Sequence, residues 1–300
     1  MEKVIKLSTE VEAALKAGNP VVALESTIIS HGLPRPSNLE VALECERIVR
    51  DAGAVPATIA LLDGKILVGL ERGELDAIAN RDDISKASIR DLAIIVAQGK
   101  SAATTVAATA HIGALAGIHI FATGGLGGVH RGANESFDES ADLTALANVD
   151  MTMICAGVKS ILDVPATLER LETLAITLVG YKTNAFPGFY LTDSGFTLEH
   201  RVDSVAEIAQ IIKARKSVGT VLKALVVANP VKIEMEKSRH DAILASGLKK
   251  AEQEGITGKL VTPFLLEHFH TTSDGESLAI NTEIIKANCL LAAQIAVALK

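Results

Sequence analysis

The segment from residue 118 to residue 142 brings together the residue types that bind an anion and a metal ion. An apolar run at 118–122 ends in a glycine-dense turn at 124–128. Two cationic or polar side chains and three carboxylates follow: His130, Arg131, Asp138, Glu139 and Asp142. Backbone N–H groups and cations receive anionic oxygens, while carboxylates are preferred ligands of Mg²⁺ and Mn²⁺. The pattern predicts a site for an anionic ligand and a divalent cation.

The acidic end of this segment is the candidate metal site. Asp138 and Asp142 are four residues apart, so in a helix they would share a face. Two carboxylates with few other protein ligands suit Mg²⁺ or Mn²⁺ completed by water, whereas zinc favours His and Cys. Acidic capping of the following helix explains these residues equally well, so both interpretations stay open.

Glu25 and Lys159 have the chemistry of an acid and a nucleophile, and each follows a predicted strand. Glu25 ends the run 20–24, at the sheet edge where α/β folds place their ligands. Partial burial there is expected to raise the pKa of its carboxyl toward the range of a general acid. Lys159 follows the run 151–156, where loss of solvation frees an amine to attack a sugar carbon. The alternatives are a solvated strand end and a surface lysine at a helix start, although a helix N-terminus disfavours a cation.

Other polar groups are placed to contact a phosphorylated ligand. Lys86 has Arg90 four residues on, and residues 104–106 begin a small-residue helix whose N–H groups can receive phosphate oxygens. Asn281 and Asn288 lie seven residues apart on one face of the last predicted helix, where an amide can read the edge of a base. Surface lysines and solvated amides are common, so none of these groups is decisive alone.

Nucleotide-binding motifs and nucleic-acid partners are excluded. A dinucleotide fingerprint starting at Gly125 needs its third glycine where His130 stands. A P-loop ending at residues 99–101 needs its first glycine where Ile94 stands. The net charge of -7 and the absence of a basic tail argue against nucleic acid bound by bulk electrostatics.

Strand-like runs alternate with helical patterns from end to end, which predicts one α/β domain over residues 1–300. Apolar strands interleaved with helices indicate a three-layer α/β/α sandwich with a mostly parallel sheet, and the Asp63-Gly64 turn predicts a hairpin that makes it mixed. Strands are expected at 20–24, 57–62, 65–70, 118–122, 151–156, 176–181 and 224–228, and helices at 1–18, 36–52, 72–80, 88–97, 102–116, 141–148, 165–174, 203–216, 235–254, 261–269 and 279–299.

The composition indicates a cytoplasmic protein with no membrane partner. Hydrophobic residues make up 48% of the chain, which can therefore bury a large core. Cys45, Cys155 and Cys289 form no CxxC pair and lie in apolar contexts, as expected of buried thiols in a reducing compartment. The N-terminus resembles neither a signal nor a transit peptide, and no apolar run is long enough to span a bilayer.

Taken together, these segments resemble the pseudouridine-5′-phosphate glycosidase family, also described as indigoidine synthase A-like. The likeness runs from about residue 5 to the C-terminus. It rests on VALESTIISHGLPRPSNLEVA, TGGLGGVHRG, the segment Asp138–Asp142, CAGVKSILDVPATLE, the stretch 186–190 (FPGFY), ANP and TPFLL. Motifs of this length in this order are highly specific.

The resemblance implies an activity and a role for each site residue. The family cleaves pseudouridine 5′-phosphate to uracil and ribose 5-phosphate with a divalent metal, typically Mn²⁺, and forms homotrimers with an α/β/α fold. Lys159 would attack C1′ and form a covalent ring-opened adduct, Glu25 would donate the proton that assists ring opening, and Asp138 would hold the metal, mostly through water. The substrate would contact Lys86, the Val106 backbone, His130, Ser140, Ala141, Asp142 and Asn281.

The expected chemistry suits an amine and an acid. A C-glycosidic bond has no heteroatom leaving group, so protonation as in two-carboxylate glycosidases is insufficient. Ring opening with an iminium at C1′ gives an electron sink, so the carbon–carbon bond can break. The resemblance thus implies a lyase-type enzyme of the pseudouridylate synthase class. Glu139 departs from the family, which usually has an apolar residue there; facing the metal it would change metal affinity, and facing solvent it would change nothing. Two other hypotheses stay open: a Schiff-base lyase acting on another phosphosugar, and a non-catalytic sugar-phosphate sensor.

Overall fold

A mixed sheet forms the middle layer of the fold in the computed structural model, which describes residues 4–257 and 260–300. Strand order is β1-β4-β3-β2-β7-β8-β11-β9-β10, with β6 beside β3 and β5 beside β6. The described strand pairs are parallel, except that β3 is antiparallel to β4 and to β6. The strands are β1 (Ile5–Leu7), β2 (Val21–Leu24), β3 (Val55–Leu62), β4 (Lys65–Val68), β5 (Ser85–Ala87), β6 (Ala102–Thr104), β7 (Ile120–Ala122), β8 (Thr152–Cys155), β9 (Thr177–Tyr181), β10 (Arg201–Val202) and β11 (Leu225–Ala228).

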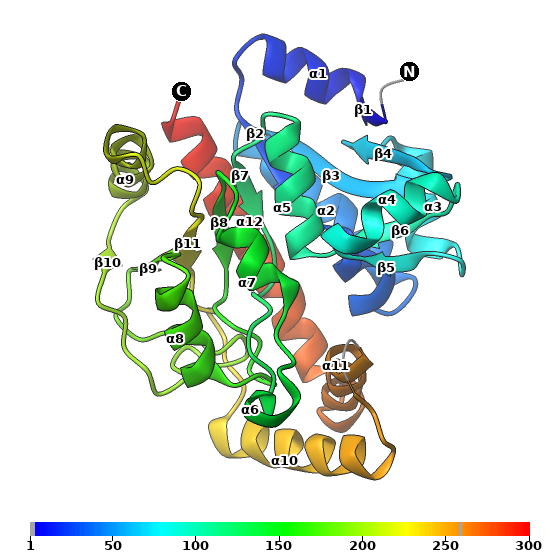
Figure 1. The fold of residues 1–300 in the computed structure, drawn as a ribbon, viewed down its shortest axis with the longest axis vertical. Helices are drawn as coiled ribbons and strands as arrows, with labels where there is room; N and C mark the ends of the chain where they lie inside the picture. The colour runs from blue at the N-terminus through cyan, green and yellow to red at the C-terminus, as the bar shows by residue number, and fades with distance from the viewer. Residues whose placement is uncertain (1–3, 258–259) are drawn as a thin grey trace.

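Helices cover both faces of this sheet (Figure 1). Successive strand residues point to opposite faces, so Val22 and Leu24 pack into the cluster formed with α2, α9 and α12, while Val21 and Ala23 pack into the cluster that includes α1, α5 and α8. The predicted three-layer α/β/α sandwich is confirmed. The helices are α1 (Thr9–Lys16), η1 (Ile28–Gly32), α2 (Ser37–Asp51), α3 (Arg72–Asn80), α4 (Ile89–Ala97), α5 (Val106–Leu115), α6 (Ala133–Ser136), α7 (Ala141–Leu146), α8 (Val164–Thr173), α9 (Val205–Val218), α10 (Lys237–Gln253), α11 (Val261–Thr272) and α12 (Glu276–Ala298).

The predicted hairpin is present between β3 and β4. Asp63 and Gly64 both have positive φ, 48° and 79°, which is the requirement of a two-residue type I′ turn. A Cβ on Gly64 would lie 2.9 Å from the Gly99 Cα, so glycine is also needed there for space.

Two predicted helices are wrong in part, and in both cases a distant strand is the reason. Residues 102–104 form β6 because Ala102 and Ala103 pair with β3, and the helix begins only after Thr105, whose hydroxyl accepts from the Ala108 N–H. Near the N-terminus, residues 5–7 pair with β4, and the helix begins after Ser8. Short β5 and β10 were not predicted. Pairing with a neighbouring strand outweighs local propensity in such short segments.

The carboxyl ends of β2, β7, β8 and β11 meet at one edge of the sheet, because these neighbouring strands are parallel. Ligands of open α/β sheets bind at this edge. Glu25 leaves β2 there, Thr123 leaves β7, and the loop carrying Lys159 leaves β8.

The three cysteines agree with the prediction of buried thiols. Cys45, Cys155 and Cys289 are buried and free. Within residues 4–257 and 260–300, no helix is long and apolar enough to cross a membrane.

Candidate active site

A cavity of about 280 Å³ opens at the carboxyl edge of the sheet. Its walls come from the segment after β2, the start of α5, the glycine turn after β7, the loop after β8, and helices α11 and α12. Every residue to which the family resemblance gave a role lines it: Glu25, Lys86, Val106, His130, Asp138, Ser140, Ala141, Asp142, Lys159 and Asn281. The fold thus gathers residues that are spread over most of the sequence.

Glu25 has the environment of a general acid. Burial raises the pKa of its carboxyl, while the positive charge of Lys159 and a hydrogen bond from the Thr123 hydroxyl partly oppose that rise. The predicted direction of the shift is confirmed. A raised pKa keeps the proton on Glu25 at pH values where an ordinary glutamate has lost it, so the group can donate that proton.

Lys159 lies in the loop between β8 and α8 and reaches the same cavity. Its Nζ donates to the carbonyl oxygen of Gly125 at 2.5 Å, and its backbone N–H donates to Leu126 O at 3.2 Å. Because α8 begins only at Val164, Lys159 is half-buried in a loop rather than exposed at a helix start. An amine and a carboxyl whose pKa is raised by burial therefore line one cavity.

Asp142 joins the glycine turn to the start of α5. Its carboxylate is 6% exposed; Oδ2 accepts from the Gly127 N–H at 3.0 Å and Oδ1 from the Ala107 N–H at 2.9 Å. Each hydrogen bond to a charged group contributes about 1.5–3 kcal/mol. Gly127 has no room for a side chain, since a Cβ would lie 2.4 Å from the Ser140 Oγ. Asp142 thus shapes the wall, and its oxygens are already bonded to backbone donors.

The candidate metal ligand Asp138 lies on a different element. It precedes α7, whereas Asp142 is in the first turn of that helix, so the expected shared helical face is wrong. Asp138 Oδ2 is 3.8 Å from His130 Nδ1; burial lowers the His130 pKa, and Asp138 opposes that shift. In the described part of the chain, no three His, Cys, Asp or Glu side chains converge as a metal cage. Asp138, acting as the one protein ligand, fits Mg²⁺ or Mn²⁺ held largely through water.

Glu139, the departure noted in the sequence, is paired with a cation. Its Oε2 accepts from Arg170 Nε of α8 at 2.9 Å. The charge of Glu139 is therefore balanced by Arg170 at the rim of the cavity.

The two asparagines of α12 separate into different roles. Asn281 is 3% exposed and lines the cavity, and among the described residues its Oδ1 meets no hydrogen-bond partner. Asn288 Nδ2 donates to Thr123 O at 2.7 Å, and its Oδ1 accepts from Asn229. Asn288 thus supports the ends of β7 and β11, while Asn281 is the amide placed to meet a ligand.

The two arginines also differ. Arg131 donates to the backbone carbonyls of Ser160 and Ile161, so it supports the Lys159 loop. Arg90 lines the cavity, as does Lys86. Arg90 is therefore the guanidinium placed near an anionic ligand.

Sequence reasoning assigned no role to Phe189 or to α11, although their motifs stood out. Phe189 packs so closely on the glycine turn that a Cβ on Gly125 would lie 2.6 Å from its ring. Thr262, Pro263 and Leu266 of α11 line the far wall of the cavity. The signal was the motifs FPGFY and TPFLL themselves, which contain none of the residues that were assigned a role in the site.

Comparison with known proteins decides the family. A family model described as "Indigoidine synthase A like protein" matches residues 10–298. The chain belongs to this family. A pseudouridine-5′-phosphate glycosidase of Salinispora tropica is 57% identical over 296 residues, covering 98% of this chain and 91% of the relative. One of Caldanaerobacter subterraneus is 47% identical over 301 residues, covering 100% and 98%.

Two solved structures share the fold. The prealnumycin C-glycosynthase AlnA, crystallised with ribulose 5-phosphate, has a TM-score of 0.91 at 33% identity, over 100% of this chain and 98% of that one. An indigoidine synthase A-like protein of Thermotoga maritima has a TM-score of 0.88 at 39% identity, over 98% and 95%. Both likenesses extend over almost the whole α/β/α sandwich.

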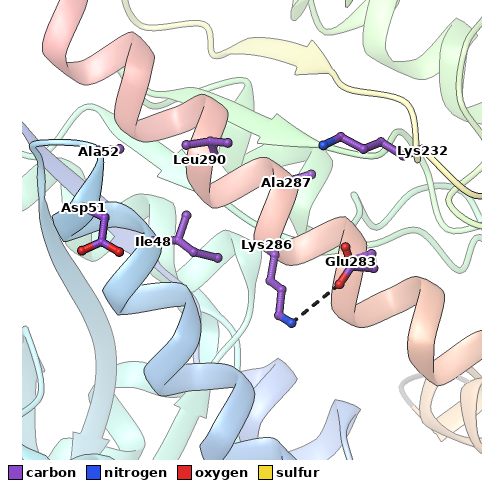
Figure 2. Close-up of a pocket in the computed structure, with 8 residues that line it drawn as sticks. All are labelled: Ile48, Asp51, Ala52, Lys232, Glu283, Lys286, Ala287 and Leu290. Carbon is purple, nitrogen blue, oxygen red and sulfur yellow. Dashed lines mark ion pairs between the residues drawn. The ribbon is translucent and has the colours of Figure 1, made fainter.

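A second cavity, of about 380 Å³, lies between the outer sides of α2 and α12 (Figure 2). Ile48, Ala52, Ala287 and Leu290 give it apolar walls, with Asp51, Lys232, Glu283 and Lys286 around them. Lys286 is paired with Glu283 at 3.6 Å. None of the predicted site residues lines this second cavity, whereas those with a role implied by the family resemblance line the cavity at the sheet edge.

Thr123→Val tests the control of the Glu25 pKa. The substitution removes the hydroxyl that stabilises the ionised carboxylate, so we expect the Glu25 pKa to rise further. If Glu25 acts as a protonated acid, the alkaline limb of the kcat/KM profile moves to higher pH. Thr109→Val, which removes another buried hydroxyl, is the control and should leave the limb in place. A limb that moves to lower pH in Thr123→Val would contradict the assignment.

Proposed function

We propose that this protein cleaves the C–C glycosidic bond of pseudouridine 5′-phosphate to give uracil and ribose 5-phosphate. The observation that carries the proposal is the pairing, in one cavity, of the Lys159 amine with the Glu25 carboxyl, whose pKa burial raises. The names of the curated relatives and the phosphosugar in the AlnA crystal structure support it.

The reaction divides into two covalent steps and a hydrolysis. The Lys159 amine forms a bond to C1′ as the C1′–O4′ bond breaks, and O4′ takes the proton of Glu25. The added nitrogen then loses one proton to water, which restores its lone pair. The C1′–C5 bond breaks, its electrons pass to the base, C5 takes a proton, and the nitrogen lone pair forms an iminium at C1′. Water hydrolyses the iminium, releasing ribose 5-phosphate and free Lys159. The base thus leaves through its carbon C5 and not through a heteroatom. Cleavage of this kind is of the lyase type.

The remaining cavity residues bind and orient the substrate. Lys86, His130 and the Val106 N–H at the start of α5 are placed to receive anionic oxygens. Ser140, Ala141 and Asp142 form the wall beside the glycine turn. The unpartnered Oδ1 of Asn281 is an acceptor for an N–H of the base.

A divalent cation, Mn²⁺ or Mg²⁺, belongs to the proposal, with Asp138 as its protein ligand. Asp138 would hold such an ion largely through water, and the ion would supply positive charge to the anionic substrate. We expect chelator treatment to lower turnover at least about tenfold, and added Mn²⁺ to restore it. Asp138→Asn should raise the Mn²⁺ concentration needed for half-maximal activity. Asp193→Asn, a change at an exposed carboxylate outside the cavity, is the control; equal metal dependence in both variants would refute Asp138 as the ligand.

Ultraviolet detection of uracil release from pseudouridine 5′-phosphate tests the function directly, with and without Mn²⁺. Borohydride trapping with a panel of sugar phosphates separates it from a Schiff-base lyase, because only the glycosidase needs a uracil base for turnover. If the protein bound the substrate without turnover in the presence of metal, only the hypothesis of a non-catalytic sugar-phosphate sensor would remain. We further propose that the reaction takes place in the cytoplasm, in a homotrimer.

A further inference from the structure

The hydroxyl of Ser160, the residue after Lys159, belongs to a hydrogen-bonded chain that the proposed reaction does not use. His240 Nε2 lies 2.8 Å from Ser160 Oγ, and His240 Nδ1 lies 3.0 Å from Asp241 Oδ1. The Lys237 ammonium lowers the Asp241 pKa, so Asp241 is an ionised acceptor and the proton between them sits on Nδ1. In the neutral ring Nε2 is then an acceptor. Ser160 therefore donates its hydroxyl proton to His240.

Ser, His and Asp in this order have the connectivity of a hydrolase triad, but burial excludes nucleophilic attack by Ser160. Ser160 is 5% exposed and His240 is 3% exposed. Neither residue lines the cavity, whereas Lys159 does. A nucleophile must reach the substrate. The hydrogen bonds between Ser160, His240 and Asp241 therefore hold the neighbouring loop, which carries Lys159, in place.

The loop that carries Lys159 is fixed on both sides of that residue. On one side, the Lys159 N–H donates to Leu126 O in the glycine turn. On the other side, the Ser160 hydroxyl is held by His240 of α10. The Lys159 side chain enters the cavity while the Ser160 side chain points into the protein.

The His240 ring is itself held firmly. It packs against Phe269 of α11 and against Tyr190, with ring centroids 5.3 Å and 6.4 Å away. Besides Asp241, the charged groups that act on the ring are Lys237 on α10 and Arg131 on the opposite loop. Since α11 also supplies Leu266 to the cavity wall, the Ser160–His240 bond joins the nucleophile's loop to that wall.

We propose that Ser160 and His240 are positioning residues that keep the Lys159 amine directed at the substrate carbon, with Asp241 orienting the His240 ring. The proposal rests on the proposed function in one respect, the role of Lys159 as nucleophile. Displacement of a reacting group by about 1 Å is enough to slow a reaction on the order of a hundredfold. Loss of the Ser160–His240 hydrogen bond, which lets the Lys159 loop move, should therefore have a measurable effect on the reaction rate.

The test compares Ser160→Ala, His240→Phe and the double variant. Phe keeps the aromatic packing and removes only the Nε2 acceptor. We expect each single variant to lower kcat about tenfold or more with KM changed less than about twofold. The double variant should be no slower than the slower single one, because both remove the same bond. His240→Gln, whose amide offers an acceptor again, should recover part of kcat. Ser246→Ala is the matched control: it removes a 2.8 Å Ser–His bond to His268, between α10 and α11, that touches no loop residue.

Amide hydrogen exchange of residues 156–163, measured without substrate, separates this proposal from the proposed function. Faster exchange in Ser160→Ala and His240→Phe, but not in Ser246→Ala, supports positioning. If the wild type released no uracil while this exchange pattern held, the proposed function would fall and the positioning of the loop would stand. Wild-type kcat and exchange in both single variants, or effects that multiply in the double variant, would overturn the proposal.

Discussion

Lys159→Ala is expected to abolish uracil release, with kcat lowered at least about a thousandfold, because the variant has no amine to bond to C1′. Borohydride treatment in the presence of pseudouridine 5′-phosphate should then leave the protein mass unchanged. The wild type should gain the mass of the reduced ribose 5-phosphate adduct. Initial rates of uracil release and intact-protein mass spectrometry measure both effects.

Two further lysine variants show whether turnover is lost because the nucleophile is missing or because a positive charge or a structural contact is missing. Lys159→Arg keeps the positive charge near Glu25 but offers no usable nucleophile, so it should be as inactive as the alanine variant. Lys223 is a half-buried lysine outside the cavity whose Nζ likewise donates to a backbone carbonyl, that of Ala147, at 2.7 Å. Lys223→Ala should retain turnover. Activity in Lys159→Arg, or a trapped adduct in Lys159→Ala, would refute the nucleophile assignment.

Glu25→Gln is expected to lower kcat by about 10² to 10⁴, the usual contribution of a general acid. Substrate binding should be nearly unchanged, because glutamine has almost the same size. The pH profile of the residual rate should lack the alkaline limb, which in the wild type comes from the ionisation of Glu25. The pH profiles of kcat and kcat/KM measure these effects.

The same substitution should change how stability depends on pH. The folded-state pKa of Glu25 is raised above its ordinary value of 4.5, so the folded protein binds more protons than the unfolded chain between those two pKa values. Stability is therefore lost as pH rises through that window, and Glu25→Gln should remove this loss. Urea unfolding at several pH values should show the variant gaining stability relative to the wild type on the alkaline side.

Glu46→Gln is the matched control for Glu25. Burial raises the Glu46 pKa as well, and its Oε1 accepts from the Thr58 hydroxyl at 2.7 Å, yet it lies outside the cavity. We expect full turnover in Glu46→Gln. If both glutamine variants lost activity equally, the effect of Glu25 would be one of folding and not of acid catalysis.

Local patterns in the sequence were sufficient for the layers of the fold. Apolar runs without polar alternation predicted the buried parallel strands, and the Asp63-Gly64 pair predicted the β3–β4 hairpin, one of the two antiparallel pairs among the described strands. They were insufficient at residues 102–104, because pairing with β3, a strand far away in the sequence, outweighs the helix preference of the two alanines.

For the candidate site, residue chemistry and family motifs pointed to Glu25, Lys159 and the other assigned residues, all of which line the cavity, because each stands at or near the end of a predicted element. Only the tertiary structure decided what each one faces. Asp142 is bonded to two backbone N–H groups, while Asp138 stands apart before α7. The Thr123–Glu25 and Ser160–His240 contacts join residues far apart in sequence. Such contacts depend on the packing of distant segments, which local periodicity and spacing do not encode.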